Sequence, residues 1–278
     1  MTPIGVVYTR TVDAGDGLEL HVECVGDGPP LLLLHGFTGD TTSWRSLTAA
    51  LCDTFMLVRL DLPGHGLSTS VRNPSRYDLV RFASDLARVL DELQLPHAAV
   101  LGYSLGGRAA LRLALGFPER VSALVLESTS AGIRDAHERA ERRAADAALA
   151  DEIEREGVPA FVDRWERLPL WESQHTMDEA VRRELRAQRL RRDPVGLANS
   201  LRGAGAGVTQ PVHDSLGSIR CRTLLVAGEL DVRYVAHSRE MARLIPGSRM
   251  ETIASAGHAV HLERPDRFAH IVRNFLTG

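Results

Sequence analysis

Ser104 is the residue whose surroundings point most directly to chemistry. It is the centre of "GYSLG", Gly102–Gly106, which matches the pattern G-x-S-x-G between a predicted buried strand and a predicted helix. In that context the serine sits on a sharp, strained turn that lifts its hydroxyl above the sheet, and residues larger than the flanking glycines would clash. The N–H of Leu105 then begins a helix and is free to donate to a negative charge. We expect Ser104 to act on a bound substrate; the alternative is a serine that only caps a helix.

A serine hydroxyl needs a base near neutral pH, and the chain offers eleven histidines. His258, in "SAGHAVH", follows the last predicted strand, and His261 is the alternative three residues later. Asp231, in "GELD", follows the preceding strand and could orient the imidazole, with Glu229 as its alternative. Because the carboxyl ends of parallel strands meet at one edge of a sheet, we predict that Ser104, Asp231 and His258 meet there.

A second anion donor is predicted in "LHGFTGD", which also follows a buried strand. The N–H of Phe37 could complete an oxyanion hole with that of Leu105. His35, in the same stretch, and His65, in "DLPGHG", are interpreted as local hydrogen-bonding residues rather than catalytic ones.

No metal or cofactor site is predicted. "HAVH" places two histidines three residues apart, but no HExxH motif or carboxylate set completes a site. The chain of 278 residues contains no lysine, so all 33 basic side chains are arginine. This excludes a Walker A lysine, a pyridoxal Schiff base and a lysine general base.

Composition also restricts partners and location. The net charge of −3 gives no basic footprint for nucleic acid, and the apolar runs are far too short to span a bilayer. The first residues lack the basic start and apolar run of a signal peptide. Cys24, Cys52 and Cys221 are far apart and form no CxxC pair, which suits a reducing compartment. We expect a cytoplasmic protein with no membrane or nucleic-acid partner; the sequence does not predict its oligomeric state.

The elements that must position these residues alternate between strands and helices. Residues 5–26 predict a β-hairpin, and apolar runs such as "PLLLLHG" and "HAAVLGYS" predict buried parallel strands. Residues 75–95 have the spacing of one long amphipathic helix. The alternation predicts an α/β fold with a mostly parallel sheet.

The alternation of strand and helix patterns stops after Gly132. Residues 133–207 show only helical patterns, including expected helices over 136–156 and 158–168, and the strand pattern resumes at "CRTLLVAGELD". We predict a core formed by residues 1–132 and 208–278, with residues 133–207 inserted as a helical cap over the sheet.

The motifs "LHGF", "DLPGHG", "GYSLGG", "GELD" and "AGH" resemble the α/β-hydrolase family along nearly the whole chain, including its order serine, aspartate, histidine. Within it, "GYSLGGR", "LESTSAGI", "DRWERLPLW" and "RAQRL" resemble the 2-succinyl-6-hydroxy-2,4-cyclohexadiene-1-carboxylate synthases, lyases of menaquinone synthesis. The last two motifs lie in the cap, where hydrolase subfamilies diverge. Ala131 departs from the proline expected in "STSPG".

The resemblance implies a lyase that eliminates pyruvate from 2-succinyl-5-enolpyruvyl-6-hydroxy-3-cyclohexene-1-carboxylate. Ser104, activated by His258, would then remove a ring proton instead of forming an acyl-enzyme. The resemblance also implies five substrate-binding residues, namely Tyr103, Arg108, Arg143, Trp165 and Arg189. Arg108 has independent support, because it lies one helical turn after Ser104 and brings positive charge to a site for a small polycarboxylate.

Three alternatives stay open. An esterase or C–C bond hydrolase could use the same serine on a carbonyl. A non-catalytic ligand-binding protein could share the fold, although binding alone needs neither a triad nor an oxyanion hole. The cap arginines could be surface residues, and Arg142 competes with its neighbour Arg143.

Overall fold

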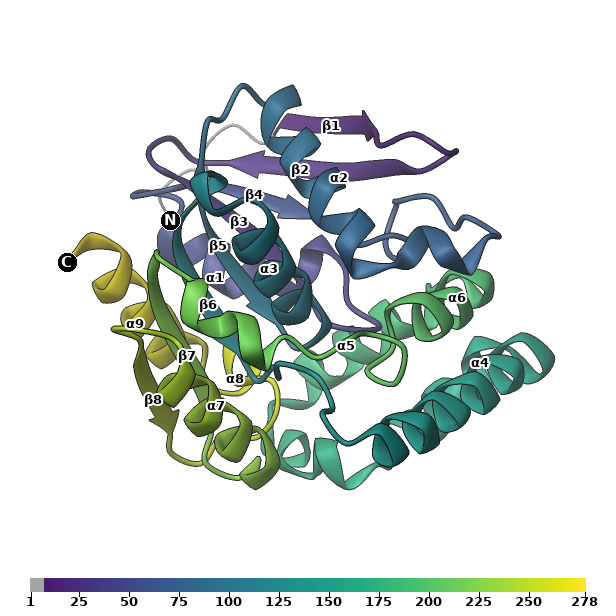
Figure 1. Ribbon diagram of the computed structural model, residues 1–278. Helices are drawn as coiled ribbons and strands as arrows, with labels where there is room; N and C mark the ends of the chain where they lie inside the picture. The colour runs from purple at the N-terminus through teal and green to yellow at the C-terminus, as the bar shows by residue number, and fades with distance from the viewer. Residues whose placement is uncertain (1–7) are drawn as a thin grey trace.

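The computed structural model describes residues 8–278 and shows an eight-stranded sheet between two layers of helices (Figure 1). The strands, in chain order, are β1 (Tyr8–Asp13), β2 (Glu19–Val25), β3 (Pro30–Leu34), β4 (Met56–Leu60), β5 (Ala98–Tyr103), β6 (Val121–Glu127), β7 (Arg222–Gly228) and β8 (Arg249–Ile253). They lie in the order β1-β2-β4-β3-β5-β6-β7-β8. All neighbours from β4 to β8 are parallel, whereas β2 is antiparallel to β1 and β4. The predicted α/β fold is confirmed.

The α-helices, in chain order, are α1 (Arg45–Leu51), α2 (Leu79–Glu92), α3 (Leu105–Gly116), α4 (Ala136–Trp165), α5 (Glu179–Leu190), α6 (Pro194–Ala204), α7 (Val232–Leu244), α8 (Val260–Glu263) and α9 (Pro265–Thr277). No helix in the described part of the chain is long and apolar enough to cross a membrane.

Alternate residues of β3 pack on opposite faces of the sheet. Leu32 and Leu34 join an apolar core with α2, α3 and α7, whereas Leu31 and Leu33 join a second core with α1, α8 and α9. All four leucines are fully buried. The strand therefore has a continuous apolar sequence because helices cover it on both sides.

Of the two elements predicted before β5, one is present and the other differs at its start. The predicted hairpin is present as β1 and β2, although residues 5–7 lie outside the described part of the chain. The single helix expected over residues 75–95 is wrong at its start, where the 3₁₀ helix η2 (Pro74–Tyr77) comes first. Asp78 has extended ψ (131°), and its carboxylate accepts the N–H groups of Val80 and Arg81. Asp78 thus ends one helix and caps the next.

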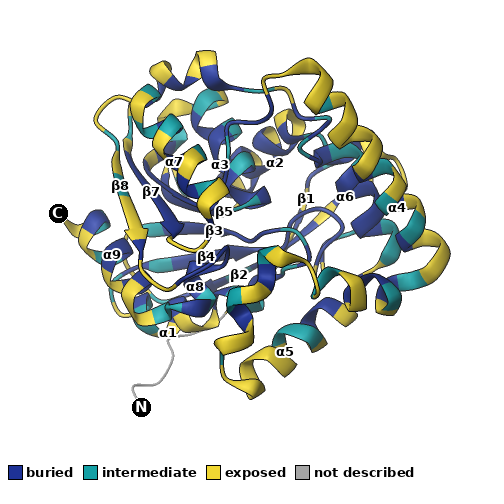
Figure 2. Ribbon diagram, turned by 90° about the horizontal axis from the view of Figure 1, so that it is seen from below, coloured by how far each residue is buried: buried dark blue, intermediate teal, exposed yellow. Residues whose placement is uncertain are grey.

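Helices α4, α5 and α6 follow one another between β6 and β7, with exposed residues along the outer faces of α4 and α5 (Figure 2). The helices expected over residues 136–156 and 158–168 are joined as α4, Ala136–Trp165. Gly157 marks the join, because its φ of 82° and ψ of 167° break the helical path. Apolar side chains of α4 and α6 form a third core, against which Phe37 packs.

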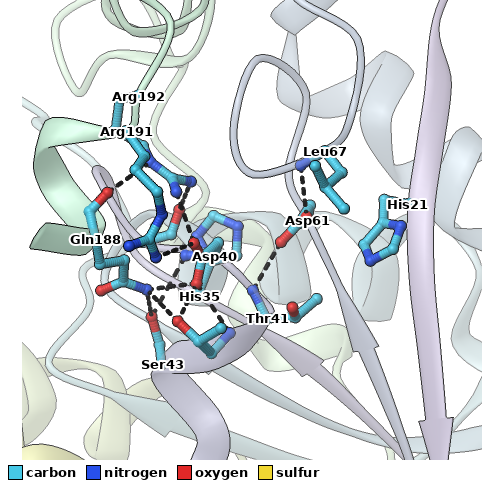
Figure 3. A network of polar contacts seen from close by, with 12 residues as sticks. His21, His35, Asp40, Thr41, Ser43, Asp61, Leu67, Gln188, Arg191 and Arg192 are labelled. Carbon is cyan, nitrogen blue, oxygen red and sulfur yellow. Dashed lines mark hydrogen bonds and ion pairs between the residues drawn. The ribbon is translucent and has the colours of Figure 1, made fainter. Parts of the chain in front are cut away.

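A buried polar network ties α5 to the turn after β3 (Figure 3). The carboxylate of Asp40 accepts hydrogen bonds from Arg192, at 2.6 Å, and from Gln188, at 2.5 Å. Burial by itself would raise the pKa of Asp40, but Arg192 and the hydrogen bonds from Thr42 and Gln188 outweigh it and lower the pKa to about 2. The ionised carboxylate of Asp40 thus holds residues 133–207, hereafter the helical segment, against the core.

Candidate active site

Ser104 lies on the tight turn between β5 and α3. Its φ of 52° is in the left-handed region, which is strained for a residue with a side chain. Two hydrogen bonds fix its backbone: its N–H donates to the carbonyl of Glu127 at 2.9 Å, and Thr129 donates to its carbonyl at 2.7 Å. A Cβ on Gly106 would lie 2.1 Å from the carbonyl oxygen of Leu34, so only glycine fits beside this turn.

His258 joins Ser104 and Asp231 in one chain of contacts. Its Nε2 lies 3.2 Å from the Oγ of Ser104, and its Nδ1 lies 2.7 Å from Oδ2 of Asp231. The imidazole and the carboxylate are both buried. When Nδ1–H donates to the aspartate, Nε2 is left with a lone pair that can accept the serine proton. The structure thus brings together the three residues that the sequence placed at this edge.

The two alternatives named from the sequence point elsewhere. The Nδ1 of His261 lies 2.8 Å from a carboxylate oxygen of Glu127, in a pair that is almost fully buried. Glu229 is exposed, and its carboxylate accepts the N–H of Ser255 at 3.2 Å.

The residues predicted to form an oxyanion hole flank the serine. Phe37 follows β3, Leu105 begins α3, and both line the same cavity as Ser104. The Leu105 N–H is at the amino end of a twelve-residue helix, where the helix dipole favours negative charge.

His35 and His65 make local hydrogen bonds, as interpreted from the sequence. The Nδ1 of His35 lies 2.8 Å from the carbonyl of Gly36, and its Nε2 accepts the N–H of Leu62 at 3.0 Å. Complete burial lowers the pKa of His35 to about 4 and keeps the ring neutral. His65 is also buried, with its Nδ1 3.0 Å from the carbonyl of Pro63. These rings hold the turns after β3 and β4 together.

The cavity above Ser104 has a volume of about 530 Å³. Its walls come from the carboxyl edge of the sheet and from the helical segment. Aromatic side chains on these walls include Tyr103, Trp171 and Tyr234. The rings of Tyr103, Trp171 and Tyr234 have their centroids 5.3, 5.5 and 4.5 Å from that of His258. The imidazole of His258 therefore lies among apolar surfaces, which strengthen electrostatic interactions inside the cavity.

Arg108 brings a positive charge into this cavity. It is half-buried on α3, and its guanidinium donates to the Oγ1 of Thr209 at 3.2 Å. No carboxylate within residues 8–278 forms an ion pair with it. On the same wall, Oδ1 of Asp146 accepts a hydrogen bond from Arg142 at 2.8 Å. Burial lowers the pKa of Arg108 to about 10, so the side chain stays protonated at neutral pH.

Of the other four predicted binding residues, two line this cavity and two do not. Tyr103 and Trp165 line the cavity of Ser104. Arg143 does not lie on its wall: the Nε of Arg143 donates to the carbonyl of Gly207 at 3.3 Å, and Arg142 lines the cavity in its place. Arg189 packs over the ring of Trp171, 5.2 Å from its centroid, and lines a separate cavity of about 360 Å³.

Arg233 and Tyr234 also line the cavity, although the sequence analysis did not single them out. Both belong to the first turn of α7, directly after Asp231, and the N–H of Tyr234 donates to that aspartate at 3.3 Å. Their position next to "GELD" is a signal that could have found them. Within residues 8–278, no group of three or more His, Cys, Asp or Glu side chains is arranged to hold a metal ion.

Comparisons with known proteins agree with this geometry. The model of the alpha/beta hydrolase fold family matches residues 29–265. The chain is 42% identical over 274 residues to a Bacillus subtilis (strain 168) protein provisionally named 2-succinyl-6-hydroxy-2,4-cyclohexadiene-1-carboxylate synthase, covering 97% of this chain and 99% of that protein. It is 30% identical to the synthase of that name from Escherichia coli O1:K1 / APEC, covering 85% of this chain and 89% of that one. The chain belongs to the 2-succinyl-6-hydroxy-2,4-cyclohexadiene-1-carboxylate synthase family.

The solved structures that resemble this synthase family member do not all carry the same name. The structure of MenH from S. aureus has a TM-score of 0.87 and 32% identity, covering 100% of this chain and 98% of that chain. A thermophilic esterase from Thermogutta terrifontis has the same TM-score of 0.87 with 29% identity, covering 98% of both chains. The family resemblance and the fold predicted from the motifs are confirmed, whereas overall shape does not separate a lyase from an esterase.

Proposed function

We propose that this protein eliminates pyruvate from 2-succinyl-5-enolpyruvyl-6-hydroxy-3-cyclohexene-1-carboxylate and releases 2-succinyl-6-hydroxy-2,4-cyclohexadiene-1-carboxylate. Membership of the synthase family supports this reaction. The substrate is a small polycarboxylate, and the cavity of about 530 Å³ is of the size that holds small ligands.

The observation that carries the proposal is the environment of Arg108. A cation in a partly apolar cavity is costly unless an anion or several hydrogen bonds compensate it. Within residues 8–278, the guanidinium of Arg108 donates to Thr209, which is neutral. A guanidinium matches a carboxylate through two parallel hydrogen bonds, so a carboxylate of the substrate supplies the missing charge.

The triad then acts as a proton-transfer device. Ser104 Oγ gives its proton to Nε2 of His258, 3.2 Å away, and removes a ring proton from the substrate. Negative charge moves onto the succinyl ketone oxygen, where the N–H groups of Phe37 and Leu105 stabilise it. The electron pair then expels pyruvate as its enolate, which takes up a proton. Asp231 keeps His258 in the tautomer that this transfer requires.

We further propose that residues 133–207 work as a cap on a core formed by residues 1–132 and 208–278. The wall of the cavity supports this division, because α4 and α6 contribute Trp165 and Leu201 to it while the sheet edge contributes Ser104 and His258. We place the protein in the cytoplasm, and its three free cysteines support a reducing compartment.

A substrate comparison tests the reaction. Purified protein is given the enolpyruvyl substrate, with pyruvate release followed by a coupled assay, and in parallel a set of simple aryl esters. The proposal predicts fast pyruvate release and slow ester hydrolysis. Good ester hydrolysis with no pyruvate release above background would assign the protein to the esterases instead.

A further inference from the structure

The loop that carries His258 is held by a buried carboxylate outside the triad. Glu263 ends the short helix α8, and its side chain turns back toward the loop. One carboxylate oxygen accepts the N–H of Gly257 at 2.6 Å, and the other accepts the N–H of Ala259 at 3.2 Å. Glu263 therefore binds the backbone on both sides of His258.

A carboxylate suits this task better than any other side chain of the same size. It presents two acceptor oxygens and no donor, so it satisfies two N–H groups at once. An amide offers only one acceptor, and its NH₂ group would face the second N–H. Because Glu263 is only 6% exposed, water cannot easily replace the lost hydrogen bond.

Neighbouring residues leave this loop little room to move if one of the two hydrogen bonds to Glu263 is lost. A Cβ on Gly257 would lie 2.0 Å from the Oγ of Ser173, so the helical segment presses directly on the residue before His258. On the other side, Glu127 accepts the backbone N–H of His261 at 3.0 Å, and its own carbonyl accepts the N–H of Ser104. The buried carboxylates of Glu263 and Glu127 thus fix the backbone of the loop. The ring of His258 contacts Asp231 and Ser104.

We propose that Glu263 is a positioning residue that sets the imidazole of His258 at hydrogen-bonding distance from Ser104. The inference rests on the proposed function, in which His258 accepts the serine proton. Glu263 itself acts through the backbone of the loop and touches no reacting atom.

Three measurements on Glu263→Gln test this role. We expect kcat for pyruvate release to fall at least tenfold while KM stays within twofold, because the triad is disturbed and the Arg108 side of the cavity is not. We expect phosphonylation of Ser104 by a fluorophosphonate to slow by a similar factor; there an Oγ–P bond forms, fluoride leaves and His258 takes the proton. The low-field ¹H resonance of the His258–Asp231 hydrogen bond should shift or broaden.

Glu229→Gln is the matched control. It makes the same chemical change to a carboxylate that accepts a backbone N–H from the same loop, but at an exposed position. We expect its kcat and phosphonylation rate to stay within twofold of wild type.

The outcomes separate the two proposals. Wild-type protein that releases no pyruvate would overturn the proposed function, and phosphonylation would still report on Glu263. Folded Glu263→Gln protein, checked by circular dichroism, that reacts at wild-type rates with an unchanged low-field proton would overturn the positioning role. If that variant does not fold, Glu263→Asp serves instead, since its shorter carboxylate cannot reach both N–H groups; a wild-type rate in that variant also overturns the proposal.

Discussion

Arg108 and Ser104 lie one helical turn apart at the start of α3, and both line the cavity beneath the helical segment. In the proposed reaction the serine supplies the reacting oxygen, while the arginine supplies a charge that an esterase for neutral substrates does not need. This pairing distinguishes the proposed reaction from ester hydrolysis more clearly than the shape of the fold does.

Replacing Arg108 tests the charge. We expect Arg108→Ala to lower kcat/KM for the enolpyruvyl substrate at least tenfold, or about 1.4 kcal/mol of transition-state stabilisation, because a carboxylate loses its partner. Arg112→Ala is the control, one turn further along α3, where the guanidinium donates to the carbonyl of Gln210. An unchanged kcat/KM in Arg108→Ala would remove Arg108 from the site.

The helical register of α4 gives a second prediction. Arg142 lines the cavity, whereas Arg143 binds the carbonyl of Gly207. We expect Arg142→Ala to raise KM roughly three- to tenfold through lost charge near the substrate, and Arg143→Ala to leave it within twofold. Steady-state kinetics of both variants give the two KM values for this comparison. A larger effect from Arg143→Ala than from Arg142→Ala would support the substrate-binding role that the family resemblance implies for Arg143.

Asp231 is expected to act through the tautomer of His258. Asp231→Asn offers an amide that can donate to Nδ1, which turns the imidazole's lone pair away from Ser104. We expect kcat to fall by about 10³- to 10⁴-fold with little change in KM. Glu229→Gln, at the alternative carboxylate after β7, should keep wild-type kcat. Wild-type kcat in Asp231→Asn, or an equally large loss in Glu229→Gln, would contradict the assignment of Asp231 as the residue that orients His258.

The pH dependence of stability should report on His35. Its pKa of about 4 in the folded protein lies below the ordinary value of 6.5, so between these values the unfolded chain binds more protons. Its contribution to stability is therefore complete above pH 6.5 and is lost as the pH falls toward 4, by roughly 3 kcal/mol.

Denaturant unfolding at several pH values checks this prediction. His35→Gln should be less stable than wild type at pH 7 and should lose less stability between pH 6.5 and 4. His270→Gln, at an exposed position on α9, should keep the wild-type slope. An unchanged slope in His35→Gln would show that another group controls acid unfolding.

The sequence predicted the parts of the site that depend on chain order along parallel strands. Ser104, Asp231 and His258 each follow a strand, so the topology alone brings them to one edge. Spacing could not show which of His258 and His261 contacts Ser104, because both follow β8. The structure shows that His261 instead contacts the buried carboxylate of Glu127.

The helical segment was harder to predict, because helix positions only one residue apart face different directions. Nothing in "AERRAAD" states whether Arg142 or Arg143 faces the cavity; that depends on how α4 packs on α6. Arg189 was expected beside the substrate, but it packs on Trp171 in a separate cavity, which is set by tertiary packing. By contrast, the sequence separated two helical patterns at Gly157, and the helical path breaks at that residue.

The most direct test of the account compares pyruvate release by wild-type protein and Ser104→Ala under saturating enolpyruvyl substrate. If Ser104 removes the ring proton, the variant should retain its fold and its affinity for the substrate but lose at least ~10³-fold in kcat. Wild-type rates in folded Ser104→Ala protein would contradict the serine-base mechanism.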